Sequence, residues 1–280
     1  MHIGIRTVAA LLLSAPISTG VYAQGTRLAY APGTQHYRLT TVVHRSQSGG
    51  AGRAPIEYDV TTKQLVTLAL APQSPDTLRL TLTVDSVSVT STIDAPTPDL
   101  AKLRGAKLTG TISPQGRIYS FQPPAGDADP QVAALYKSFQ KFLWPFPAQP
   151  VSVGSNWVDT TTDRVRKEIF DVTTTTITSS KLAADTTFVG QRAWKVEHSA
   201  DVAQSGDGRE GENPIHLSGD GSITGVHYVS KRGVYLGSKS TQRSEIRMSM
   251  KDSESAPISQ TIKSTVELVP PGAHTAMPHS

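Results

Sequence analysis

The stretch Thr77-Leu-Arg-Leu-Thr-Leu-Thr-Val84 decides the fold class. Leucine or valine occupies every second position, and threonine or arginine fills the positions between them. This period of two predicts a strand with one buried and one solvated face. The apolar set then changes phase at Asp85-Ser86, because Val87 and Val89 continue it one position late. We therefore expect a bulge or a turn at that point.

The same alternation extends from Tyr37 to Leu268, with short turn sequences between the apolar runs. Pro114-Gln-Gly116 and Lys231-Arg-Gly233 are examples of turns that close hairpins. Strands that follow each other at hairpin distance leave no room for crossover helices, so the pairing should be antiparallel. The sequence thus predicts a mainly β fold built on one large curved antiparallel sheet, either a half-barrel or a sandwich-like arrangement.

One segment, residues 130–144, has the spacing of a helix instead. Asp129 can cap it, Pro130 suits its first turn, and Pro145 ends it. Its apolar side chains form one broad face, which predicts an amphipathic helix that covers the sheet. This face is either ordinary core packing or a lid over an apolar cavity. If it is a lid, the side chains that would line the ligand site are Leu135, Phe139, Phe142, Trp144, Trp157 and Trp194.

The ends of the chain differ from the middle. Residues 1–23 predict a cleaved signal peptide, with Arg6, a short apolar run and Val21-Tyr-Ala23 before Gln24. A membrane span needs about 20 apolar residues, and Ser14 and Pro16 interrupt this run too early. We expect a β-rich domain over 24–269, with two possible halves, 24–144 and 151–269, joined by a proline-rich segment. Residues 270–280 lack periodicity and predict a disordered tail.

The composition excludes several classes of protein. The chain has no cysteine, which rules out a disulfide framework, a thiol nucleophile and a lipid-modified cysteine. Its net charge of +4 is spread over a chain with only 18% charged residues, so nucleic acid is not an expected partner. We expect an exported protein, periplasmic or secreted, that is not a lipoprotein and has no transmembrane segment after signal cleavage.

No motif predicts catalysis or metal binding. There is no Gly-x-Ser-x-Gly, and the Ser-x-x-Lys match at Ser138 lies too late in the predicted helix to act as a nucleophile. The histidines lack the close spacing of a metal site, and the acidic segment 206–212 lacks the spaced oxygen ligands of a calcium loop. We therefore assign no catalytic residue, no metal and no cofactor. A carboxylate pair assembled only in space leaves no signature, so a hydrolase stays open as an alternative.

Two segments carry a family resemblance. Phe146-Pro-Ala-Gln-Pro-Val-Ser-Val-Gly-Ser-Asn-Trp157 and Phe188-Val-Gly-Gln-Arg-Ala-Trp-Lys-Val196 resemble segments of uncharacterised exported bacterial β-sheet proteins, a domain of unknown function. Those proteins are similar to the periplasmic lipoprotein carriers of the Lol type. The resemblance implies a curved half-barrel whose helices cover an apolar cavity, and it implies no catalytic residue. This chain departs from the carriers by having a single predicted helix.

These observations favour a non-enzymatic envelope protein that binds an apolar or amphiphilic ligand, such as a lipid, on a curved sheet. A protein partner, for example another envelope protein, could occupy the same surface. The first alternative is a structural or assembly protein that acts by strand pairing, because threonine-rich edges with few charges suit strand addition. The second alternative is the hydrolase with a spatially assembled site.

Overall fold

The computed structural model describes residues 25–47, 54–93, 100, 103–122, 139, 142–166, 170–210, 213–250, 253–254 and 257–270. The predicted signal peptide, the predicted tail beyond Pro270 and most of the predicted helix over 130–144 lie outside these residues. Within the described part of the chain, no helix has the length and apolar character needed to cross a membrane.

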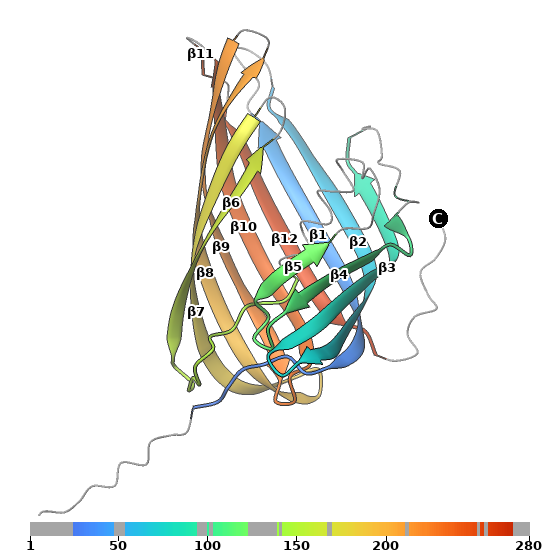
Figure 1. Ribbon diagram of the computed structural model, residues 1–280. Helices are drawn as coiled ribbons and strands as arrows, with labels where there is room; N and C mark the ends of the chain where they lie inside the picture. Colours follow the sequence, from blue (N-terminus) through green and yellow to red (C-terminus); the bar gives the residue numbers. More distant parts are fainter. Residues whose placement is uncertain are drawn as a thin grey trace, which may run out of the picture.

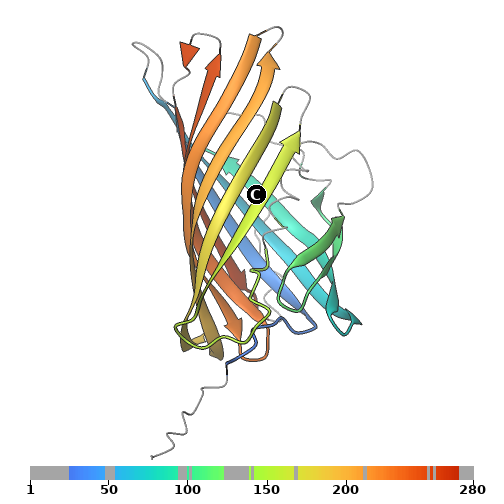
Figure 2. The same ribbon diagram turned by 60° about the vertical axis from the view of Figure 1, so that its left-hand side comes forward.

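The described residues form one antiparallel sheet in the order β5-β4-β3-β2-β1-β12-β10-β9-β8-β7-β6, with β11 paired to β10. The sheet is strongly curved, and its edges β5 and β6 are not paired with each other (Figures 1 and 2). Pairing of β1 with β12 joins the first five strands to the remainder. The strands are β1 (Gly33–Gln47), β2 (Ile56–Ser74), β3 (Thr77–Ser91), β4 (Lys107–Ile112), β5 (Ile118–Gln122), β6 (Asn156–Arg166), β7 (Phe170–Phe188), β8 (Gln191–Glu210), β9 (Asn213–Ser230), β10 (Tyr235–Met250), β11 (Ser253–Glu254) and β12 (Ile258–Leu268).

The mainly β, antiparallel prediction is confirmed, and so is the irregularity in β3. Val66 of β2 faces Val84, whereas the preceding residue Leu65 faces Ser86. Asp85 is therefore an extra residue, and the bulge returns Val87 to the same face as Val84. The phase change in the sequence predicted this bulge because a one-residue slip would otherwise turn the following apolar side chains outward.

The two faces of the sheet differ sharply. We call the side that carries Tyr37, Leu68 and Val196 the inner face, and the opposite side the outer face. At the end of the sheet where these residues lie, the inner face is fully buried and forms the core. Buried partners from neighbouring strands include Val66, Leu80, Leu82, Val84, Leu108, Ile112, Leu182 and Val229.

The prediction of a covering helix over 130–144 is not supported by the few residues described there: Phe139 has helical geometry, whereas Phe142, Leu143 and Trp144 do not. Irregular chain covers the core instead: residues 26–31 and residues 142–151 cross the closed end of the inner face (Figure 1). The second segment contains Pro145, Pro147 and Pro150. Proline lacks an N–H donor and disfavours helical geometry in the residue before it, so this segment is extended.

Candidate functional site

The segment 142–151, together with Phe139, closes one end of the inner face, and we call it the plug. Phe139, Phe142, Leu143 and Phe146 are buried in the core. Trp144 is anchored by Tyr30, whose hydroxyl accepts from the Trp144 N–H at 3.0 Å and donates to the Trp144 carbonyl at 2.9 Å. Together these contacts fix the plug on the sheet.

Two backbone contacts tie the plug to the rest of the chain. Val151 exchanges hydrogen bonds of 2.7 and 2.9 Å with Thr26, and Phe146 N–H donates to the Gln115 carbonyl at 2.8 Å. Gly116 has φ of 86° and lies so close to Tyr30 that an added Cβ would stand 2.6 Å from its ring. Glycine is therefore required where the β4–β5 turn meets the plug.

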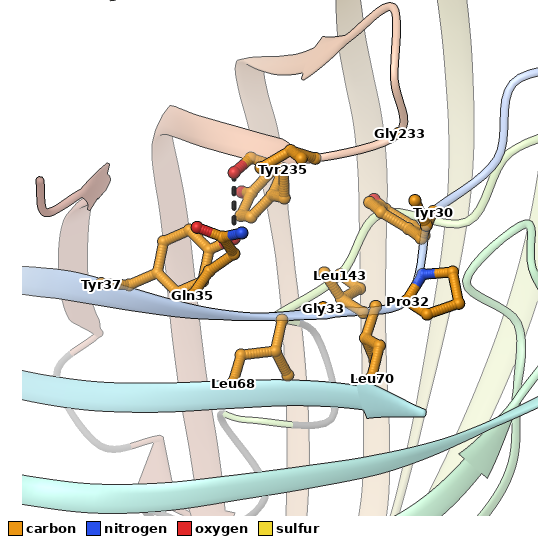
Figure 3. Close-up of a pocket in the computed structure, with 12 residues that line it drawn as sticks. Tyr30, Pro32, Gly33, Gln35, Tyr37, Leu68, Leu70, Leu143, Gly233 and Tyr235 are labelled. Carbon is orange, nitrogen blue, oxygen red and sulfur yellow. Dashed lines mark hydrogen bonds between the residues drawn. The ribbon is translucent and has the colours of Figure 1, made fainter. Parts of the chain in front are cut away.

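Three tyrosines pack beside the plug (Figure 3). The Tyr37 hydroxyl donates to the Tyr235 carbonyl at 2.9 Å, and the ring of Tyr30 meets that of Tyr235 edge-on at 6.3 Å. Burial raises the pKa of all three hydroxyls, so they are neutral donors. The cavity among them measures about 20 Å³, room for a single water and too small for a ligand. This end of the inner face is packed rather than hollow.

Two buried histidines lie against Trp144. The centroid of the Trp144 ring system is 4.1 Å from that of His198 and 4.4 Å from that of His227, and the two imidazoles are 4.9 Å apart. His227 Nδ1 lies 3.3 Å from the Tyr235 hydroxyl. The other buried nitrogens, His198 Nδ1 and His227 Nε2, have no hydrogen-bond partner in the described structure. These two nitrogens lost their hydrogen bonds to water on folding and gained no protein partner in exchange.

The environment keeps both imidazoles uncharged. Burial lowers the pKa of His198 from 6.5 to about 4. Burial also lowers the pKa of His227 well below its usual value, and the neighbouring His198 adds to the effect because two like charges would repel. Gly225 makes room for the pair, since a Cβ there would stand 2.5 Å from His198 Cε1. The plug thus rests on two neutral imidazoles at neutral pH.

Beyond the plug, the inner face carries a cross-strand row rich in hydroxyl groups. The pairing register aligns Ser180, Ser240, Ser264, Thr41 and Thr62, with His198 and Gly225 in the same row. We call these five hydroxyl side chains the hydroxyl belt. Ser240, Ser264, Thr41 and Thr62 are partly exposed, and no hydrogen bond links their hydroxyls to another described residue. These groups are therefore available to water or to a polar solute.

A second polar row lies four residues further along each strand. It contains Thr161, Thr176, Ser244, Gln260, Arg45 and Tyr58, all aligned by the register. Arg45 Nη1 donates to the Tyr58 hydroxyl at 3.1 Å. The row between the two is mixed, with Ile223, Ile262 and Val43 beside Gln242. The inner face beyond the plug thus carries alternating polar and apolar bands, and we call this banded surface the trough.

The outer face is mostly polar, although Val158 and Ile177 are exposed on it. Charged side chains are paired on this face: Lys195 with Glu197 along β8 at 2.6 Å, and Arg164 on β6 with Asp171 on β7 at 2.5 Å. Two arginines hold the pKa of Asp171 down at about 2, chiefly through the hydrogen bond from Arg164. This composition is that of a sheet surface in contact with water.

The residues predicted to line a ligand site are only partly brought together. Phe139 and Phe142 are buried in the core, and Trp144, Trp157 and Trp194 pack against it. Lys231 Nζ stands 2.8 Å from the centre of the Trp194 ring, so that tryptophan also takes part in a cation–π contact. Leu135 lies outside the described residues. Whether any of the six contacts a ligand stays a prediction.

Sequence analysis missed the residues that define this region. His198 was expected in the core or its wall, but its stacking with His227 on Trp144 was not foreseen, because it depends on the register of β8 with β9 and on Trp144, which is distant in sequence. The hydroxyl belt was also missed, since each strand contributes one or two ordinary serines or threonines. The pairing register is the signal that unites them. Across the described chain, no three His, Asp or Glu side chains are close enough to hold a metal ion.

No family model matches this chain, and no curated protein matches its sequence. Among solved structures, the chain is similar to Pseudomonas aeruginosa OccK2 (OpdF) in complex with glucuronate, with TM-score 0.29, 10% identity, and coverage of 87% of this chain and 100% of that one. It is also similar to the COG4313 outer membrane channel from Pseudomonas putida F1, with TM-score 0.20, 8% identity, and coverage of 90% and 100%. A mutant Rh. blastica porin has TM-score 0.24, 8% identity, and coverage of 84% and 100%.

These neighbours, which include an outer membrane channel and a porin, contradict several predictions made from the sequence. The prediction of a periplasmic or secreted protein without transmembrane segments is wrong by this comparison. The predicted lipid or envelope-protein partners, the strand-pairing alternative and the hydrolase alternative are not supported, and neither is the resemblance to the lipoprotein carriers. The TM-scores of these three structures are all 0.29 or lower, so the function proposed below is argued from this chain's own residues.

Proposed function

We propose that this chain serves in the transport of small hydrophilic solutes, which it holds on the inner face beyond the plug. The observation that supports this is the hydroxyl belt. Four of its hydroxyls lack a protein partner in the described structure, although they lie on the face that elsewhere forms the core. A face built only for core packing would be expected to carry apolar side chains at these positions.

The alternating polar and apolar rows of the trough suit solutes that carry hydroxyl groups on one side and C–H groups on another. Hydroxyls of the belt and of the second polar row can each donate and accept, so they can replace the water around a polar solute. The aliphatic side chains between the rows offer contact to the less polar side of the same solute. Weak, exchangeable contacts of this kind suit passage, because tight binding would hold the solute in place.

The plug gives the trough one closed end. The cavity beside it holds no more than a single water, so a solute that enters the trough meets the stacked Trp144 and the two histidines. Any movement of solute past this end requires the plug to shift. The proposal therefore places the solute between the plug and the opposite rim of the sheet.

Saturation-transfer NMR on the purified chain with a panel of small sugars tests the proposal. A triple variant, Thr41→Val with Ser240→Ala and Ser264→Ala, removes three belt hydroxyls. The matched control, Thr40→Val with Thr241→Val and Thr265→Val, removes three hydroxyls from the outer face of the same strands. We expect transfer to the sugars in the native protein and in the control, and its loss in the belt variant. Absence of transfer in the native protein, or equal transfer in both variants, would overturn the proposal.

A further inference from the structure

A groove on the outer face lies over four adjacent strands, β1, β12, β10 and β9, on the opposite side from the trough. It has a volume of about 500 Å³, enough for a small molecule. Its lining combines one arginine, one histidine and two carboxylates with hydroxyl groups. The residues that matter for the argument are His44, Asp220, Ser222, Arg243, Glu245 and Thr261.

The first observation concerns the positive charge. Arg243 lies directly between Ser222 on β9 and Thr261 on β12, and Thr261 is in turn paired with His44 on β1. Three other arginines of this face have carboxylate partners: Arg164, Arg166 and Arg247. Arg243 has none among the described residues. A guanidinium flanked by two hydroxyls, with its donors unused, is a ready partner for a carboxylate.

The second observation concerns the negative charges one row further along. Asp220 on β9 and Glu245 on β10 are direct cross-strand partners, an arrangement that is unfavourable for two like charges. Arg247 compensates Glu245, whereas Asp220 has no cationic partner within the described chain. A cation placed between the two carboxylates would relieve this repulsion. The groove therefore contains one cation, Arg243, and one anion, Asp220, that form no ion pair with each other or with another described residue.

We propose that this groove binds a small zwitterion of the amino-acid class. The carboxylate of the ligand lies against Arg243, with hydrogen bonds from Ser222 and Thr261. Its ammonium group lies between Asp220 and Glu245. The inference is independent of the hydrophilic-solute function, because every residue with these roles lies on the outer face and the belt lies on the inner face.

Isothermal titration of the full chain with L-alanine tests the site. We expect saturable binding that weakens at least about tenfold for N-acetyl-L-alanine, which lacks the positive charge, and for L-alanine methyl ester, which lacks the negative one. Arg243→Gln and Asp220→Asn should each weaken L-alanine binding by about tenfold, the size expected for loss of one charge-assisted hydrogen bond. Lys263→Gln, on the same face of β12 but outside the groove, is the matched control and should bind as the native chain does.

Several results would overturn the assignment. One is the absence of saturable heat with L-alanine. Others are equal binding of the acetylated and free amino acids, and unchanged affinity in both charge variants. The belt variant Thr41→Val with Ser240→Ala and Ser264→Ala should bind L-alanine normally. Loss of L-alanine binding in that variant would place the ligand in the trough and refute the groove, whereas failure of sugar contact alone would refute only the transport proposal.

Discussion

Lowering the pH from 7 to 5 should destabilise the protein through the two histidines beneath Trp144. A group whose pKa is lower in the folded state than in the unfolded state opposes folding once the unfolded state binds its proton. Both histidines belong to this class. The lowered pKa values therefore cost no stability well above pH 6.5, and stability is lost as the pH falls below that value.

The magnitude follows from His198. A pKa of about 4 in the folded state against 6.5 in the unfolded state corresponds to a loss of about 2 kcal/mol at pH 5. His227 acts in the same direction. The carboxylates with a shifted pKa, including that of Asp171 at about 2, titrate at lower pH and contribute little to this interval.

Urea unfolding at pH 7 and pH 5 measures the effect. Replacing His198 by leucine removes the contribution of this histidine to the pH dependence. The free energy of unfolding of the variant should therefore fall by about 2 kcal/mol less than that of the native chain between the two pH values. His216→Leu, at an exposed position on the outer face of β9, is the control for loss of a histidine. If His198→Leu and the native chain show the same pH dependence, then His198 is not held neutral against the plug and the reasoning fails.

Further perturbations test the packing of the plug and of the sheet. Trp144→Ala should lower the free energy of unfolding by about 3 kcal/mol in urea, because it removes the ring stacked on both histidines; an unchanged midpoint would mean that the plug does not contribute to the core. Gly225→Ala should cost about 1–3 kcal/mol and lower Tm, since the new methyl group meets His198 and the Lys239 carbonyl; native-like melting would refute this contact. Tyr37→Phe should cost about 1 kcal/mol in the same assay by removing the hydrogen bond to the Tyr235 carbonyl, and a neutral effect would count against it. NMR titration should give Asp171 a pKa of about 2 that rises in Arg164→Gln; an ordinary aspartate pKa in the native chain would show that the ion pair does not form in solution.

The sequence predicted the sheet because one physical signal, the period of two, repeats in every long strand. It also predicted the bulge at Asp85, since the change of phase is visible within eight residues of a single strand. It did not predict the extended plug. Apolar side chains at Phe139, Phe142 and Leu143 fit a helical face, but the three prolines that follow favour extended chain over the core.

The functional features depend on register, which local patterns leave open. Thr41, Ser240 and Ser264 come from three strands that are distant in sequence, and only the pairing of β1, β12 and β10 sets them in one row. The same holds for Arg243 between Ser222 and Thr261. A shift of one residue in any of these pairings would move the side chains to the opposite face. Such sites emerge only when the strand order and the register are both known.

The absence of cysteine from the native chain allows a direct test of the trough by single-cysteine labelling. Ser240→Cys places a thiol on the belt, and Val196→Cys places one in the fully buried core as the closed reference. Our account predicts that a charged, water-soluble thiol reagent modifies Ser240→Cys rapidly and Val196→Cys hardly at all, with a bound sugar slowing only the former. Equal, slow modification of both positions would show that the inner face beyond the plug is closed to water, and would contradict the account.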